Sequence, residues 1–200
     1  TEAFAGAVAA TGSPVALVAL QAVRLEDLAP SQRLYQLRHQ DLADVHLPLR
    51  TLSDVPNNLP PQQTHFVGRA RERHAVQLLL SLYRLVTIVG GGGIGKTRLA
   101  LQVAASNAAR FPDGVWLVEL ASARHAVQVA VEIASAIGLE DAVGDPLALV
   151  AARLAPRRCL VILDNCEFDP LAAAAVAEHL AAACPELHIL AVSRRALECP

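Results

Sequence analysis

Apolar positions follow two alternating patterns from residue 69 onward. Short runs rich in β-branched residues, typical of strands buried on both faces of a sheet, occur at 84–89, 114–120, 158–164 and 187–193. Longer stretches with helical patterning occur at 69–82, 96–111, 125–139, 145–155 and 169–184. Strands that alternate with helices are typical of an α/β fold in which parallel strands are joined by right-handed crossovers.

Residues at the ends of three helical stretches support this division. Asp145 and Asp169 each precede a proline, and aspartate followed by proline is typical of an N-cap and a first helical residue. Gly138 lies near the end of the stretch 125–139 and predicts a C-cap.

The first third of the chain has a different pattern. Residues 1–46 hold short apolar runs joined by polar residues, and prolines and asparagines in 47–64 exclude a regular helix or central strand. We therefore expect an upstream domain remnant at 1–46, a linker or extended surface segment at 47–64, and an incomplete α/β domain at 65–200. The missing initiator Met and the end at Pro200 suggest a fragment of a longer protein.

Composition narrows the class of protein. The chain is 54% hydrophobic with a formal net charge of −2, which argues for a folded domain without a basic nucleic-acid or membrane surface. The apolar N-terminal stretch is interrupted by Gly12, Ser13 and Pro14, so neither a signal peptide nor a membrane span is expected. The four cysteines lack metal-ligand spacing, and we expect them to be reduced in the cytoplasm.

The segment 90–97, GGGGIGKT, carries the strongest chemical signal. It matches the Walker A pattern G-x-x-x-x-G-K-[ST] and lies between a predicted strand and a predicted helix, where a P-loop must be. Its backbone N–H groups and the helix N-terminus favour a phosphate chain, and this context disfavours a mere flexible turn. The predicted nucleotide-binding residues here are Gly90, Gly92, Gly93, Ile94, Gly95, Lys96, Thr97 and Arg98.

Individual side chains of this site have separate expected roles. Lys96 is expected to reach the β- and γ-phosphates, and the Thr97 hydroxyl is expected to bind Mg²⁺. Asp164 ends the apolar run CLVILD and is a candidate Walker B ligand of the same ion, with a turn or capping aspartate as the alternative.

The residues after Asp164 bear on catalysis. Asn165 stands where many hydrolytic P-loop enzymes have a second acid, and an amide cannot act as a base. Glu167 is a candidate substitute base, and a solvated loop charge is the equal alternative. Nucleotide binding is thus better supported than fast turnover.

Three further features resemble a known group of P-loop proteins. A strand between the P-loop strand and the Asp164 strand resembles the branch that contains AAA+ and STAND ATPases. HFVGRARE, residues 65–72, looks like the segment with which NB-ARC and related STAND proteins cover adenine, which implies backbone contacts from Val67 and Gly68. AVSRRAL resembles a sensor segment and implies that Arg194 reads the terminal phosphate, although Arg195 is adjacent and a basic surface turn is the alternative.

Together these motifs, spread over residues ~57–198, resemble the NTPase domain of bacterial AfsR- and LuxR-associated STAND regulators. RLEDLAPSQRLYQLRHQDL resembles the closing segment of class III adenylate/guanylate cyclase domains, but that match is short. No cyclase metal-binding aspartate can be assigned within 1–46, so cyclase activity is not inferred.

The resemblance implies an ATP/ADP-binding switch with slow hydrolysis in a cytoplasmic signalling or transcriptional regulator, with Mg²⁺ as cofactor. An ATPase whose turnover is the output and a regulatory module of a cyclase are the alternatives. Further domains beyond residue 200 and nucleotide-dependent oligomerisation are the implied partners. Direct nucleic-acid contact is not expected, since neither a helix-turn-helix signature nor a basic face is evident.

Overall fold

The computed structural model describes residues 16–23, 32–38, 55–60, 68–139 and 143–197. The chain divides into two compact units, residues 1–51 with 64–66 and residues 52–63 with 67–200. The first unit contains an antiparallel pair of strands, β1 (Ala16–Val23) and β2 (Gln32–Arg38), with Ala16 opposite Arg38. Two of the apolar stretches in this part of the chain therefore form strands.

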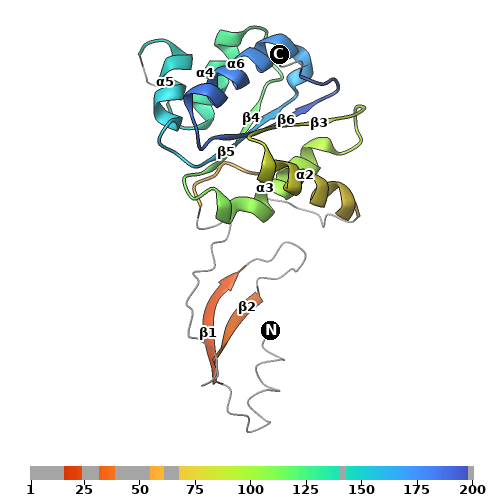
Figure 1. Cartoon of the computed structure of the whole chain (residues 1–200), viewed down its shortest axis with the longest axis vertical. Coiled ribbons are helices and arrows are strands. Elements are labelled where there is room, and N and C mark those ends of the chain that lie inside the picture. The colour runs from red at the N-terminus through yellow and green to blue at the C-terminus, as the bar shows by residue number, and fades with distance from the viewer. Residues whose placement is uncertain (1–15, 24–31, 39–54, 61–67, 140–142, 198–200) are drawn as a thin grey trace. The chain divides into compact units, whose positions relative to one another are not determined.

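The second unit is built on a parallel sheet of four strands (Figure 1). These are β3 (Leu85–Val89), β4 (Val115–Glu119), β5 (Leu160–Asp164) and β6 (His188–Ser193). Their order in the sheet is β3-β6-β5-β4, and all neighbouring pairs are parallel. All four strands were predicted from the sequence, to within two residues at each end.

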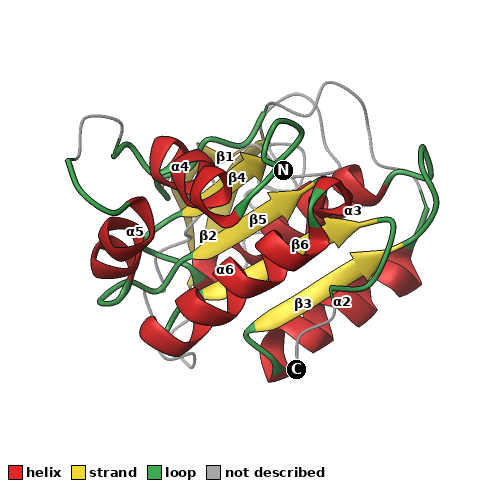
Figure 2. Cartoon of the chain, turned by 90° about the horizontal axis from the view of Figure 1, so that it is seen from above, coloured by secondary structure: helices red, strands yellow, loops and turns green. Residues whose placement is uncertain are grey.

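Helices cover both faces of this sheet (Figure 2). The helices are α2 (Ala70–Leu82), α3 (Lys96–Asn107), α4 (Ala126–Ala136), α5 (Pro146–Leu154) and α6 (Pro170–Ala183). Helices α2 and α3 lie on one face, and α4, α5 and α6 lie on the other. The predicted three-layer α/β fold is confirmed, with the glycine-rich loop between β3 and α3 as a P-loop requires. Among the described residues, no helix has the length and apolar character needed to span a membrane.

The core explains why the two central strands are mostly apolar. Every residue of β5 is buried, and so are all those of β6 except His188, because helices pack on both faces of these strands. The alanine-rich helix α6 packs its small side chains against the sheet, and Ala173 and Ala177 are fully buried. Because these side chains are small, α6 lies close to the sheet, and this closeness fills the core in place of bulky side chains.

The predicted helix ends are confirmed. The Asp145 and Asp169 side chains accept hydrogen bonds from the backbone N–H groups of Leu147 and Ala172 at 3.2 and 3.0 Å. Each satisfies an N–H that lacks a partner within its own helix. Gly138 has φ 76°, the left-handed backbone that a C-cap glycine adopts.

Part of the predicted linker lies against the sheet. Asn57 forms a parallel bridge with Val115, and Val55 is buried. The Asn58 side chain pairs with the backbone of Leu117: Nδ2 donates to the carbonyl at 2.8 Å, and Oδ1 accepts from the N–H at 2.6 Å. Residues 55–58 therefore cover the exposed edge of β4, which protects a strand edge that would otherwise be open to pairing.

We expect Asn58→Ala to lower the free energy of unfolding by about 1 kcal/mol, because it removes two hydrogen bonds at a position where water replaces them only in part. Urea unfolding of the chain measures this difference. Asn58→Asp keeps the acceptor but turns a carboxylate oxygen toward the Leu117 carbonyl, so it should lose at least as much, whereas an aspartate variant as stable as the wild type would contradict the pairing role of the amide.

Candidate functional site

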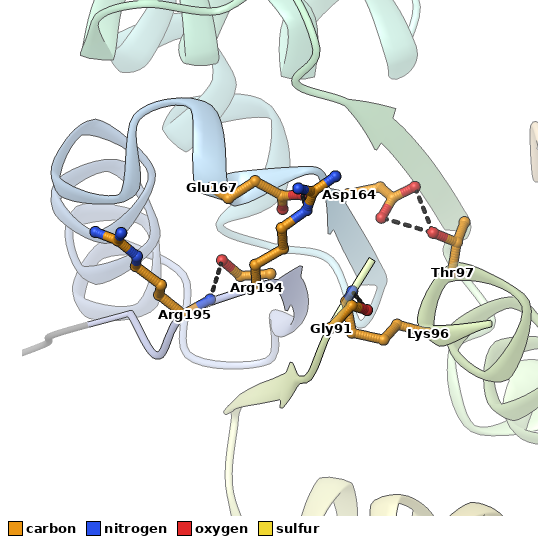
Figure 3. A network of polar contacts seen from close by, with 8 residues as sticks. Gly91, Lys96, Thr97, Asp164, Glu167, Arg194 and Arg195 are labelled. Carbon is orange, nitrogen blue, oxygen red and sulfur yellow. Dashed lines mark hydrogen bonds and ion pairs between the residues drawn. The ribbon is translucent and has the colours of Figure 1, made fainter. Parts of the chain in front are cut away.

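The predicted site residues come together at the carboxyl edge of the sheet. Strand β6 lies between β3 and β5, so the segments that follow these three strands are neighbours. The backbone N–H of Gly90, just after β3, donates to the Ser193 carbonyl at the end of β6 at 3.3 Å. The edge at which open α/β sheets bind ligands therefore holds the glycine-rich loop, Asp164 and Arg194 (Figure 3).

The glycines of the loop meet different steric demands. Gly93 and Gly95 have φ 73° and 84°, where a side chain would be strained. Gly92 is constrained by a neighbour instead, since a Cβ there would lie 3.3 Å from the Arg194 guanidinium carbon. Gly91 meets neither demand, since its φ is not positive and the nearest neighbour of such a Cβ would lie at 4.0 Å. A larger residue is therefore tolerated best at Gly91.

Lys96 begins helix α3 and is buried, with its side chain folded along the loop. Its Nζ donates to the Gly91 carbonyl at 2.9 Å (Figure 3). Gly91 to Gly95 are exposed, so the loop backbone is accessible to a ligand while the ammonium group lies beneath it. This places one positive charge and a helix N-terminus at the same loop, an arrangement that favours an anion.

Thr97 and Asp164 meet directly, although 67 residues separate them in the sequence. The Thr97 hydroxyl lies 2.9 Å from each carboxylate oxygen of Asp164, whose exposed fraction is 4%. These are hard oxygen donors of the kind that Mg²⁺ uses together with phosphate oxygens. No group of three His, Cys, Asp or Glu side chains suited to a metal occurs among the described residues.

The turn after β5 places Glu167 beside Arg194. Asn165 has a left-handed backbone, φ 61°, and leads into a short 3₁₀ turn, Cys166–Phe168. The Glu167 Oε1 atom lies 3.0 Å from Arg194 Nε, and the Glu167 side chain is 17% exposed. Glu167 is therefore a paired, mostly buried carboxylate, and the solvated-charge alternative does not describe its position.

The two adjacent arginines point in different directions. Arg194 points toward the loop and Glu167, whereas the Arg195 side chain points away from them (Figure 3). The backbone N–H of Arg195 donates to Ser193 Oγ at 3.2 Å, and Ser193 is fully buried, so the two arginines follow β6 on an anchored turn. Sequence reasoning left open which arginine turned inward, because both belong to one short segment and only the turn distinguishes them.

The remaining predicted residues lie around this centre or outside the described residues. Ile94 is exposed at the loop tip and Arg98 lies half-buried in the first turn of α3. Gly68 immediately precedes Arg69, the N-cap of α2, and both have left-handed backbone. Val67 lies outside the described residues.

Cys166, which follows Asn165, was not singled out for this site. Burial raises the pKa of its thiol to about 12, and the Sγ–H donates to the Leu163 carbonyl at 3.2 Å. The thiol is therefore unreactive at neutral pH and serves to hold the turn in place. Cys159 and Cys184 are also buried free thiols, and Cys199 lies outside the described residues.

Comparisons with known proteins relate the chain to bacterial regulators. No protein-family model matches it. A Mycobacterium tuberculosis protein provisionally named an HTH-type transcriptional regulator is 44% identical over 120 residues, 60% of this chain and 13% of that protein. An uncharacterized M. tuberculosis protein is 34% identical over 82% of this chain and 41% of its own length. The regulatory protein AfsR of Streptomyces coelicolor is 36% identical over 55% of this chain and 13% of its own length.

The chain thus spans between 13% and 41% of the length of these relatives. Among solved structures, a STAND protein with a tetratricopeptide repeat sensor from Pyrococcus horikoshii is 20% identical over 77% of this chain and 24% of its own, with TM-score 0.46. Cdc6p from Pyrobaculum aerophilum is 16% identical over 64% of this chain and 39% of its own, also with TM-score 0.46. Since such scores do not establish a common fold, the α/β assignment rests on strand order and the loop.

The chain is accordingly similar to segments of bacterial proteins named as transcriptional or regulatory. The resemblance of residues 1–46 to a cyclase tail finds no support in these comparisons.

Proposed function

We propose that residues 65–200 form an NTPase-type module of the NB-ARC/STAND kind that binds ATP and ADP and acts as a nucleotide switch in a longer cytoplasmic regulator. The observation that carries this proposal is the contact of Thr97 with Asp164 beside Lys96. A glycine-rich loop alone can be a simple turn. A simple turn does not require a buried aspartate such as Asp164 in contact with the hydroxyl of Thr97, the residue after Lys96. The regulator-named relatives support a signalling role.

Each residue has a chemical task in this proposal. The loop N–H groups and Lys96 hold the phosphate chain, because both are donors fixed at a helix N-terminus. Thr97 and Asp164 hold Mg²⁺, which offsets the charge of the triphosphate when bound. Gly68 lies at the start of α2, where its backbone and that of Val67 are proposed to face the adenine.

The proposed switch hydrolyses ATP slowly. Asn165 occupies the position directly after Asp164 and cannot take a proton from water. Glu167, the candidate substitute base, engages Arg194 through one of its two oxygens. A switch needs different contacts in its two nucleotide states and tolerates slow turnover. The ATPase whose turnover is the output remains the alternative.

Calorimetry with ATP and with ADP, each with and without Mg²⁺, tests the proposal. We expect both nucleotides to bind, and ATP to depend more strongly on Mg²⁺ because its extra phosphate adds negative charge. Binding of neither nucleotide at millimolar concentration would overturn the proposal. Multiple-turnover hydrolysis well above ~1 s⁻¹ would favour the enzyme alternative.

A further inference from the structure

The ion pair between Arg194 and Glu167 joins two loops that the sheet order makes neighbours. Arg194 follows β6, the strand that lies between β3 and β5, whereas Glu167 follows β5. From this central place, the Arg194 side chain pairs with the Glu167 carboxylate (Figure 3), and its guanidinium lies close enough to the glycine-rich loop that a Cβ on Gly92 would be 3.3 Å from it. Glu167 is thus the only acidic group paired with Arg194 in the part of the chain that the structure describes.

The two partners are not equally free to move. Glu167 is 17% exposed on a turn that buried Cys166 anchors, whereas Arg194 is 64% exposed. An ion pair this exposed contributes little to folding stability. A long, mostly solvated arginine side chain has many conformations, and a fixed carboxylate at its Nε selects one of them. The contact is therefore better suited to directing Arg194 than to stabilising the fold.

The selected conformation brings the guanidinium to the phosphate loop. Glu167 engages Nε, one of the three guanidinium nitrogens, and leaves the forked end to reach elsewhere. At that end, Nη2 would lie 3.3 Å from a Cβ on Gly92. Gly92 does not have a positive φ, so a side chain there would meet this Arg194 conformation and not backbone strain.

We propose that Glu167 is a positioning residue, which holds Arg194 by Nε so that the forked end of the guanidinium binds the nucleotide phosphates above Gly92. This inference rests on the proposed function and assigns Glu167 a task other than that of a base. Nucleotide affinity then depends on Glu167 through Arg194, and the dependence needs an oxygen acceptor at position 167 more than it needs a negative charge.

ATP affinity in the presence of Mg²⁺, measured by calorimetry on the 200-residue chain, tests this positioning role. We expect Arg194→Ala to weaken ATP binding about tenfold, the scale of one charge-assisted hydrogen bond. Glu167→Ala should weaken it several-fold, and the double variant should bind no more weakly than Arg194→Ala alone. Glu167→Gln keeps an oxygen that accepts from Nε and should retain most of the wild-type affinity.

Matched controls separate positioning from general charge effects. Arg195→Ala removes the same charge from the adjacent residue and should leave ATP affinity unchanged. Gly92→Ala should displace Arg194 and mimic Glu167→Ala, whereas Gly91→Ala has space for its methyl group and should have a smaller effect. In nucleotide-free protein, the Arg194 Nε–H NMR signal should exchange faster with water in Glu167→Ala than in wild type or Glu167→Gln.

Several results would overturn the inference. One such result is an unchanged ATP affinity in Glu167→Ala. Others are losses that add fully in the double variant, or Glu167→Gln binding ATP as weakly as Glu167→Ala. Each would contradict the positioning role, while ATP binding by the wild-type chain would still support the proposed function. If the wild-type chain binds no nucleotide, the proposed function fails and this inference fails with it.

Discussion

Replacement of Lys96 by alanine should reduce ATP and ADP affinity by about 100-fold or more, because in the proposed function its buried ammonium makes at least two charge-assisted contacts with the phosphates. The fold should persist. Lys96 begins helix α3, where a positive charge opposes the helix dipole, and its hydrogen-bond acceptor, the Gly91 carbonyl, belongs to an exposed residue that water can reach. We therefore expect a change in unfolding free energy of no more than about 1 kcal/mol.

The sequence offers an unusually direct measurement of this effect. Lys96 is the single lysine among the 17 Lys and Arg residues of the chain. An acyl-phosphate derivative of ATP transfers its acyl group to a nearby amine, forming an amide and releasing ATP. Peptide mapping should find the label at Lys96, and excess ATP should prevent it. The N-terminal amine, which maps to a different peptide, reports reactivity that does not depend on the site.

Arg153→Ala is the matched control for Lys96→Ala. Arg153 is an exposed cation in the last turn of α5, so its loss changes the net charge equally without touching the loop. Nucleotide affinity should stay at the wild-type value in this variant. Equal affinity in wild type and Lys96→Ala would show that the loop is not a phosphate site.

The second unit could be predicted closely because its signals are local. The four strands read as short apolar runs, and Asp145, Asp169 and Gly138 mark helix ends through chemistry confined to one turn. The predicted boundaries of the upstream segment and linker, by contrast, rest on proline content alone. The pairing of Asn58 with Leu117 could not be predicted, because an asparagine that imitates a strand partner has no periodic pattern.

The site shows the same division between local and distant information. The loop, Lys96 and Thr97 form one contiguous motif, and Asp164 follows from its place at the end of a strand. The pairing of Glu167 with Arg194 depends on β6 lying between β3 and β5, and sequence order does not reveal that insertion. If β3 and β5 were neighbours in the sheet, β6 would not lie between them, and the loops that carry Glu167 and Arg194 would lie in different places.

Replacement of Asp164 by asparagine should have opposite effects on Mg²⁺-dependent binding and on stability. Asp164 is 4% exposed, and the Thr97 hydroxyl donates to it. An amide oxygen still accepts that hydrogen bond, while removal of a buried charge relieves its desolvation cost. The melting temperature should therefore be unchanged or higher. The increase in ATP affinity on adding Mg²⁺, about tenfold or more in wild type, should largely disappear because a neutral amide is a poor ligand for this ion.

The Mg²⁺ dependence of ATP affinity, measured by titration at fixed ionic strength, separates this effect from general electrostatics. Glu186→Gln removes one exposed negative charge just before β6, at the opposite edge of the sheet, and should keep the full Mg²⁺ dependence. Mg²⁺-dependent binding that survives in Asp164→Asn would place the ion elsewhere. A large fall in the melting temperature of Asp164→Asn would instead make Asp164 a structural residue. Folding would then depend on the negative charge of Asp164, whereas the proposed function uses that charge to bind the ion.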